Sequence, residues 1–274
     1  MNGILGVDIS MYQEGIDFAR LMADGAKFAI LRGGDGDYKD KCFDGFYAEA
    51  KAHNLPIGAY WFSRATTEEA ARTEATDFYN RCLKGRQFEL PIYMDVEAEK
   101  LKRLGKTALN KVIQAWCDTM REFGMLPGIY TNTSWLNNYL DFDKLTGVEL
   151  WHAQWSTREP SSDHGMWQFG GETNFLRSNT MAGKIVDQNL MSKDYPKIIK
   201  EAGLNGYKKE ALPVETKIDT RYHKLEDLPA WAQPEIKELM DAGALKGDEN
   251  GDLDLSLDMV RVLIVALRYN KATQ

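Results

Sequence analysis

The chain has 274 residues, of which 43% are apolar and 27% are charged, and its net charge is −7. This length accommodates one large domain and a small one, and the composition is typical of globular proteins. The negative charge argues against a nucleic acid bound through its phosphates, and no apolar run is long enough to cross a membrane. The first residues also lack the basic segment and apolar core of a secretory signal.

Cysteine and histidine usage predicts neither disulfides nor a metal centre, and we expect no cofactor. The three cysteines, Cys42, Cys82 and Cys117, are odd in number and far apart, so buried thiols are expected. The histidines are scattered, and neither an HExxH nor a CxxC motif occurs.

Strands alternate with helices through the first half of the chain. Thr66 with Glu69, and then Thr107, have the spacing of helix caps, and Gly124 is expected to end a helix. Five strand–helix units are predicted, with strands at 3–10, 27–33, 56–62, 91–97 and 127–131 and helices at 16–23, 43–53, 66–82, 107–123 and 135–139. Three strands with little helix between them follow at 149–155, 166–169 and 184–189, and then a helix at 195–202. This α/β pattern predicts a parallel barrel whose final third is irregular.

The end of the chain changes character. Residues 207–224 have no apolar periodicity and are interpreted as a linker between a barrel at 1–206 and a helical module at 225–274. The module contains a helix at 232–242 and a second helix capped by Ser256. Two such helices have little core of their own, so we expect them to associate with another copy or with the barrel.

The strand at 91–97 ends in two acids. Side chains alternate along a strand, so Asp95 and Glu97 share one face with Tyr93, while Met94 and Val96 take the other. Two close carboxylates repel each other, which favours a proton on one of them at neutral pH. A proton donor beside a carboxylate is what acid-assisted cleavage of a glycosidic bond requires.

Carboxyl groups follow apolar residues at the ends of three predicted strands. They are Asp8, Asp95, Glu97 and Asp187. The active sites of parallel barrels lie where the strands end, so we expect the four acids in one cleft. The alternative for any one of them is a helix cap or an ion pair with Arg32.

Aromatic residues gather at the same strand ends, where they could line a sugar-binding cleft. They are Tyr60, Trp61, Phe62, Tyr130, Trp151, Trp155, Trp167 and Phe169. For any single residue in this group, packing in the core is the competing interpretation.

Together these segments resemble the muramidases of glycoside hydrolase family 25, the Chalaropsis-type lysozymes. The similarity covers residues 1 to about 203. The matching segments, in order, are Gly6-Val7-Asp8-Ile9-Ser10 with Tyr12-Gln13, Gly58-Ala59-Tyr60-Trp61-Phe62-Ser63-Arg64-Ala65, Met94-Asp95-Val96-Glu97, Gly128-Ile129-Tyr130-Thr131, Trp151-His152-Ala153-Gln154-Trp155, Trp167-Gln168-Phe169 and Val186-Asp187-Gln188-Asn189. The resemblance implies a flattened barrel, similar to a TIM barrel, of five β/α units plus three strands. It also implies hydrolysis of the β-1,4 bond between N-acetylmuramic acid and N-acetylglucosamine.

The resemblance also implies residue roles. Glu97 becomes the proton donor, Asp95 its charged partner, and Asp8 and Asp187 complete an acidic floor. Whether Asp95 attacks carbon directly or the substrate's own acetamido group assists stays open. The hydrophobic residue usual after the last aspartate is here Gln188. The expected sugar contacts are Tyr60, Phe62, Tyr130, Trp151 and Gln168.

We therefore expect a peptidoglycan hydrolase of the endolysin type, held in the host cytoplasm until it is released to the cell wall. The alternative is a binding protein on the same barrel that has lost catalysis. A chitinase-like barrel is disfavoured because its Asp-x-x-Asp-x-Asp-x-Glu signature is absent. The end of the chain weakly resembles a wall-binding segment of the S-layer-homology type, so a wall polymer is one expected partner and a homodimer the other. The similar features are Trp231-Ala232, Gly243, Leu245-Lys246-Gly247 and Ser256 to Arg261.

Overall fold

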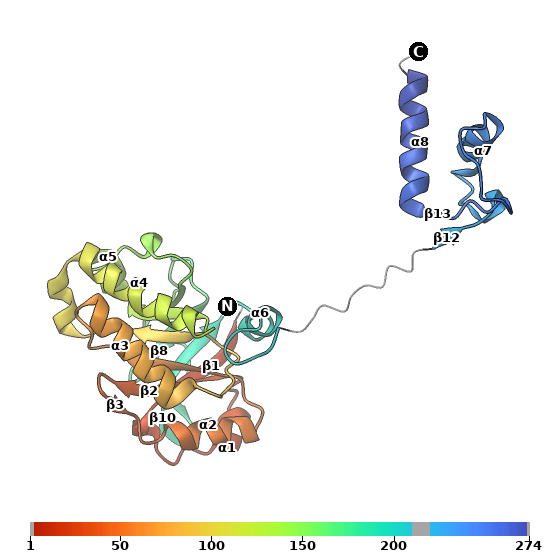
Figure 1. Ribbon diagram of the computed structural model, residues 1–274. Helices are drawn as coiled ribbons and strands as arrows, with labels where there is room; N and C mark the ends of the chain where they lie inside the picture. Colours follow the sequence, from red (N-terminus) through yellow and green to blue (C-terminus); the bar gives the residue numbers. More distant parts are fainter. Residues whose placement is uncertain (1–2, 210–219, 273–274) are drawn as a thin grey trace. The chain divides into compact units, whose positions relative to one another are not determined.

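The computed structural model describes residues 3–209 and 220–272. The chain divides into two compact units, Met1–Glu210 and Ala211–Gln274, whose elements are labelled in Figure 1. The predicted linker at 207–224 lies partly outside the described residues. Within the described residues, Tyr207 packs against a hydrophobic core of the first unit, to which it belongs, and Arg221–Tyr222 form a strand of the second.

The first unit is built on a nine-stranded sheet with the order β1-β11-β8-β7-β6-β5-β4-β2-β3. An additional pairing of β1 with β2 closes this sheet, apart from the edge strand β3, into a barrel. The strands are β1 (Ile4–Ile9), β2 (Ala29–Asp35), β3 (Tyr38–Lys39), β4 (Ile57–Phe62), β5 (Ile92–Asp95), β6 (Pro127–Asn132), β7 (Glu149–Ala153), β8 (Met166–Gly170) and β11 (Asp187–Met191).

Helices follow the first five barrel strands and lie on the outside of the sheet (Figure 1). This order confirms the predicted five β/α units followed by three strands. The helices are α1 (Phe18–Ala23), α2 (Phe43–Ala52), α3 (Glu68–Phe78), α4 (Lys106–Glu122), α5 (Thr133–Asn138) and α6 (Tyr195–Ala202). A small hairpin of β9 (Thr180–Met181) and β10 (Lys184–Ile185) precedes β11.

The last barrel strand differs from the prediction of a parallel barrel. β11 runs antiparallel to both β1 and β8, and Asp8 lies opposite Asp187 in the register. Asp187 is thus the first residue of its strand and not the last. Because an antiparallel strand begins at the edge where its neighbours end, Asp187 still reaches the edge where β1 ends.

Two hydrophobic cores lie on the two faces of the sheet. Met94 and Val96 belong to the larger one, together with buried residues of α1 to α4. Tyr93 belongs to the other, which contains Trp151 of β7 and Tyr195 of α6. The predicted alternation along β5 is therefore correct, and it places the Asp95 side chain on the same face of the sheet as Tyr93.

Two predicted helix caps are wrong. α3 is capped by Thr67, whose hydroxyl accepts a hydrogen bond from Ala70 N at 3.1 Å, and not by Thr66. α4 begins at Lys106 directly after Gly105, at φ 74°, with no side-chain cap at all. A 3₁₀ segment, Glu99–Leu104, runs into this glycine and fixes the start of α4 before Thr107 is reached. The thiols of Cys82 and Cys117 are buried as predicted, and Cys42 is half-buried.

The second unit is small. Strand β12 (Arg221–Tyr222) pairs with β13 (Leu255–Ser256), and helices α7 (Gln233–Asp241) and α8 (Leu257–Ala272) pack beside them. Ser256 Oγ accepts from Met259 N at 3.2 Å, which is the predicted cap. The core consists of Leu228, Ala232, Ile236, Leu253, Leu255, Val260 and Ile264. In residues 3–209 and 220–272, no helix combines the length and apolarity needed to span a bilayer.

We predict that Gly33→Ala destabilises the barrel by about 1–3 kcal/mol. A Cβ at Gly33 would lie 2.2 Å from the ring of the buried Phe78, so the core would have to shift. Gly45→Ala is the matched control, because it lies in α2 with nothing within 4 Å of an added Cβ, and it should stabilise by about 0.5–1 kcal/mol. Urea unfolding followed by tryptophan fluorescence measures both changes. Equal stability of the two variants would contradict the prediction.

Candidate active site

The four predicted acids line one small cavity of about 80 Å³. Four of the five predicted sugar contacts line it as well. The lining residues are Asp8, Tyr60, Asp95, Glu97, Tyr130, Trp151, Gln168 and Asp187. The fifth predicted contact, Phe62, does not line this cavity, and its ring instead lies 4.6 Å from the Arg64 guanidinium.

The barrel closure brings these acids together. Asp8 comes from the end of β1, Asp95 is the last residue of β5, and Asp187 is the first residue of β11. Val96 N donates to Tyr130 O at 2.9 Å, so the chain keeps its extended course beyond β5 and Glu97 stays at the same rim. Residues far apart in the sequence thus meet because β1 pairs with both β2 and β11.

Two amide side chains hold Asp8. Gln168 Nε2 and Asn189 Nδ2 each donate to Asp8 Oδ2 at 2.9 Å. Gln168 Nε2 also lies 3.5 Å from Asp187 Oδ2. These bonds stabilise the charged form of Asp8, because an amide N–H donates best to an anion.

Aromatic side chains orient both amides. Gln168 Oε1 accepts from Tyr130 OH at 2.9 Å and from Trp155 Nε1 at 3.0 Å. Asn189 Oδ1 accepts from Trp151 Nε1 at 2.7 Å. Each amide oxygen faces aromatic donors, so each amide nitrogen must face the acids.

This network gives two of the predicted sugar contacts a role within the protein. Trp151 is 1% exposed, and both polar atoms of Gln168 are engaged within the protein, while both residues line the cavity. Their contact with a sugar stays a prediction. No role was predicted for Asn189. Its spacing of two residues from Asp187 is the signal that could have placed it on the same face of β11.

Burial raises the pKa of every acid in the cavity. The pKa of Asp8 rises to about 6, although the bonds from Asn189 and Gln168 oppose the change. Burial and then the charge of Asp8 raise the pKa of Asp187 to about 8, and both effects also raise the pKa of Glu97. The pKa of Asp95 rises well above its ordinary value through burial and then through Glu97 and Asp8.

At neutral pH Asp187 is therefore mostly protonated, whereas two amide donors favour the charged form of Asp8. Asp95 is 4% exposed, and its Oδ1 has no hydrogen-bond partner within the described residues. This differs from the expectation that Asp95 stays charged, because burial without donors disfavours a carboxylate.

A second cavity of about 560 Å³ adjoins the acids, since it shares Asp8, Tyr60 and Asp187 with the first. The two cavities are thus neighbours beside a buried acid cluster, where a substrate could be bound. A larger cavity of about 790 Å³, lined by residues such as Asp35, Arg64 and Glu74, contains none of the predicted site residues.

Residues 7–176 match the family described as glycosyl hydrolases family 25, which is more than half of the chain. The chain belongs to this family. Buried carboxyl pairs with raised pKa values are what glycoside hydrolases use to protonate a leaving oxygen.

Curated relatives share part of this family 25 chain. An autolytic lysozyme from Clostridium acetobutylicum is 25% identical over 159 residues, which is 58% of this chain and 47% of the relative. The match therefore spans about half the length of that protein. An N,O-diacetylmuramidase from Chalaropsis sp. is 30% identical over 142 residues, covering 48% of this chain and 67% of the relative.

The fold is also similar to solved structures. The CTP1L endolysin aligns with a TM-score of 0.62 and 23% identity, over 72% of this chain and 69% of its own. At this identity the comparison establishes the fold, and it agrees with the barrel described above.

We predict that Asp187→Asn stabilises the protein more at pH 8 than at pH 4. The folded chain holds a proton on Asp187 that the unfolded chain releases between about pH 4 and pH 8. The contribution of Asp187 to the free energy of unfolding is therefore greatest at low pH and is lost as the pH rises through the folded pKa. An asparagine has no proton to release, so the variant does not show this loss. The gain should differ by at least about 1.4 kcal/mol, the equivalent of one pKa unit.

Urea unfolding at the two pH values measures this difference. Asp37→Asn is the control, since Asp37 is exposed on the surface and its replacement should give no such trend. A gain for Asp187→Asn that is the same at both pH values would contradict the prediction.

Proposed function

We propose that this family 25 chain hydrolyses the β-1,4 bond between N-acetylmuramic acid and N-acetylglucosamine in bacterial peptidoglycan. The observation that carries the proposal is the convergence of four carboxyl groups on one cavity of the barrel. Relatives named as lysozymes and N,O-diacetylmuramidases support the same substrate class. Storage in the host cytoplasm before release to the wall stays a prediction.

Glu97 is the proton donor in this proposal. Its side chain is half-buried, lines the cavity and makes no hydrogen bond within the described residues. Burial and then the charge of Asp8 raise its pKa, which favours a proton on this side chain. A donor needs this combination of a retained proton and an accessible position.

Asp8 and Asp95 oppose the positive charge that develops on the sugar. Asp8 is held as an anion by two amide donors. Asp95 is buried beside Glu97, and a developing cation there would lower its pKa and favour its charged form. The carboxylates therefore interact more favourably with the positively charged transition state than with the neutral substrate.

We predict that Glu97→Gln lowers turnover by roughly 10²- to 10⁴-fold, because the amide cannot donate the proton. Glutamine has nearly the same shape, so the melting temperature should change little. Clearing of a wall suspension measures the rate. Glu69→Gln, an exposed acid on α3, should retain the normal rate, and a Glu97→Gln variant that clears walls as fast would refute the assignment.

Reducing-end analysis of digested peptidoglycan tests the bond specificity. New muramic acid ends support the proposed cleavage, whereas new glucosamine ends would place the cut at the other bond. The absence of new ends would favour a binding protein on the same barrel.

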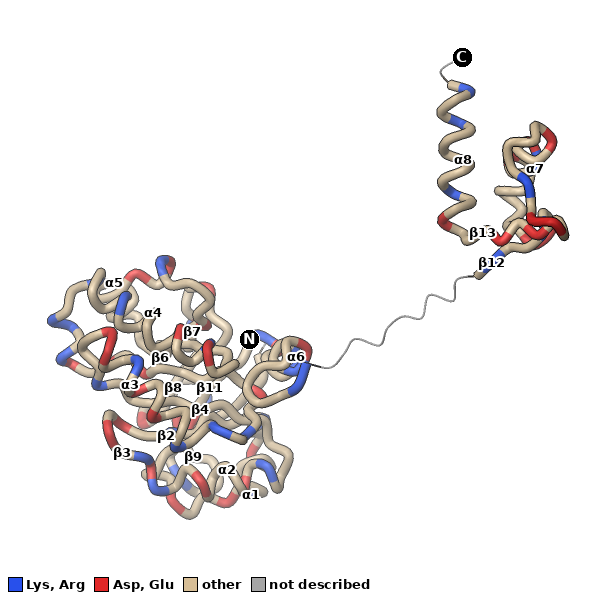
Figure 2. Tube along the Cα trace, in the orientation of Figure 1, with Lys and Arg blue, Asp and Glu red and all other residues tan. Residues whose placement is uncertain are grey.

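For the second unit we propose binding to a wall polymer. Trp231 is 49% exposed, as an aromatic platform for a carbohydrate would be. Acidic residues gather in the loop between α7 and β13 (Figure 2), so an anionic polymer would need specific contacts. The rival proposal is a homodimer, for which Val262 and Val265 on α8 offer exposed apolar surface, 67% each.

We predict that a chain truncated after Lys209 loses retention on purified walls and keeps the same number of chains per particle as the full chain. Wall pull-down and light scattering measure the two properties, and hydrolysis of a soluble glycan controls for an intact barrel. A truncated chain that changes from dimer to monomer while retaining wall affinity would instead support the homodimer.

A further inference from the structure

Arg32 lines the 560 Å³ cavity next to the acids. The cavity reaches from Tyr12 to Trp155, and its cationic lining residues are Arg32 and Lys184. Since the cavity also includes Asp8, whatever it binds lies directly beside the proposed site of cleavage.

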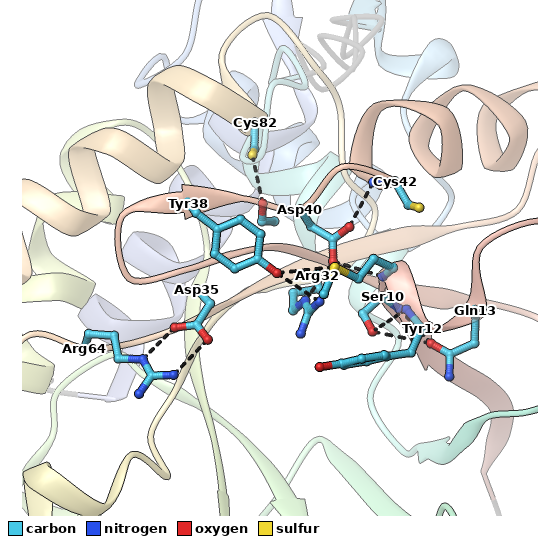
Figure 3. A network of polar contacts seen from close by, with 12 residues as sticks. Ser10, Tyr12, Gln13, Arg32, Asp35, Tyr38, Asp40, Cys42, Arg64 and Cys82 are labelled. Carbon is cyan, nitrogen blue, oxygen red and sulfur yellow. Dashed lines mark hydrogen bonds and ion pairs between the residues drawn. The ribbon is translucent and has the colours of Figure 1, made fainter.

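A buried carboxylate fixes the orientation of Arg32. Asp40, 1% exposed, accepts from Arg32 Nε at 2.7 Å, and it also accepts from the backbone N–H groups of Met11 at 3.0 Å and Cys42 at 2.9 Å (Figure 3). A buried ion pair generally contributes little to the free energy of folding. We therefore interpret Asp40 as a residue that positions the Arg32 guanidinium. No bond to Asp40 engages the two terminal nitrogens of the guanidinium within the described residues.

A bulge at the end of β2 aims this side chain. Arg32 lies opposite Tyr60 and Gly34 opposite Trp61, so Gly33 is an extra residue in the strand. Bulges at barrel rims commonly redirect a side chain toward a site.

The exposed side of the guanidinium keeps donors available. Its Cζ lies 5.2 Å from the Tyr12 ring, and Nη2 is 3.4 Å from Tyr38 OH. Nη1 makes no hydrogen bond within residues 3–209 and 220–272. Figure 3 shows the guanidinium between Asp40 and the ring of Tyr12.

We propose that this cavity is a subsite in which Arg32 binds a carboxylate carried by the muramoyl residue, either on its lactyl group or on a peptide attached there. The inference rests on the proposed function. The planar guanidinium matches a carboxylate through two parallel hydrogen bonds. Tyr12 and Trp155, exposed by 75% and 41%, offer aromatic faces for the sugar itself.

Acids and bases both line this cavity: Asp8, Glu172 and Asp187 face it together with Arg32 and Lys184. Burial raises the pKa of Asp187 to about 8, so at pH 7 it is mostly neutral. Asp8 accepts hydrogen bonds from Gln168 and Asn189, which partly offset its negative charge. N-acetylmuramic acid differs from N-acetylglucosamine by its lactyl group, so a bound carboxylate would distinguish the two sugars.

The experiment measures binding by calorimetry in the Glu97→Gln background, so that the ligand is not cleaved. The probes are the N-acetylglucosamine–N-acetylmuramic acid disaccharide with a free lactyl carboxylate, its neutral lactyl amide, and the disaccharide carrying a peptide. The carboxylate form should bind roughly 10- to 100-fold more tightly than the amide. Arg32→Lys should remove most of this preference and leave the affinity for the amide unchanged.

Arg32→Lys keeps a cation for Asp40, which guards against misfolding, and its single ammonium cannot serve Asp40 and the ligand together. Arg64→Lys is the matched control, because Arg64 pairs with Asp35 through two bonds and lies outside this cavity. It should retain the full preference. If the peptide-bearing probe exceeds the amide in affinity, and Arg32→Lys removes that excess, the peptide is a second source of the carboxylate.

Equal affinity for the carboxylate and amide forms would overturn the inference, as would an Arg32→Lys variant that weakens both equally. Cleavage by the wild-type chain is tested separately on peptidoglycan. Intact cleavage without the binding preference refutes the subsite alone, and an intact preference without cleavage refutes the proposed function alone.

Discussion

Repulsion among four carboxyl groups is the constraint on which this site depends. Asp8, Asp95, Glu97 and Asp187 share a cavity of about 80 Å³, where they cannot all be ionised. The protein accommodates them by burial, which raises the pKa of all four, and by amide donors that favour the charged form of Asp8. A reservoir of protons beside an anion is the electrostatic state that acid-assisted hydrolysis of a glycoside begins from.

The position of that negative charge depends on hydrogen bonds donated by aromatic side chains. Trp151 and Tyr130 donate to the oxygens of Asn189 and Gln168, and the opposite ends of these amides then face Asp8. Loss of the Trp151 donor would free Asn189 Oδ1, whereas Gln168 Oε1 would still accept from Trp155 Nε1 without Tyr130. The aromatic residues at the mouth of the barrel therefore belong to the electrostatics of the site as much as to any contact with sugar.

The same mouth contains a second, separate arrangement of charge. Asp40 joins the segment after β1, the end of β2 and the segment after β3 through Met11, Arg32 and Cys42. The cavity that Arg32 lines adjoins the acid cavity, so the proposed anion-binding residue Arg32 and the proposed proton donor Glu97 line neighbouring cavities. A substrate with a sugar backbone and an acidic substituent is complementary to both.

The order of elements, the faces of β5 and the four acids could be predicted from the amino acids, because hydrophobic periodicity and strand ends are local properties. Met94 and Val96 lie in one core and Tyr93 in the other, as their alternation required. The direction of β11 could not be predicted in this way, because it depends on pairing with β1 and β8, which are distant in the chain. The hydrogen bonds of Trp151 and Gln168 and the raised pKa values of the acids also became visible in the fold alone, since burial and hydrogen bonding arise between residues that are far apart in the sequence.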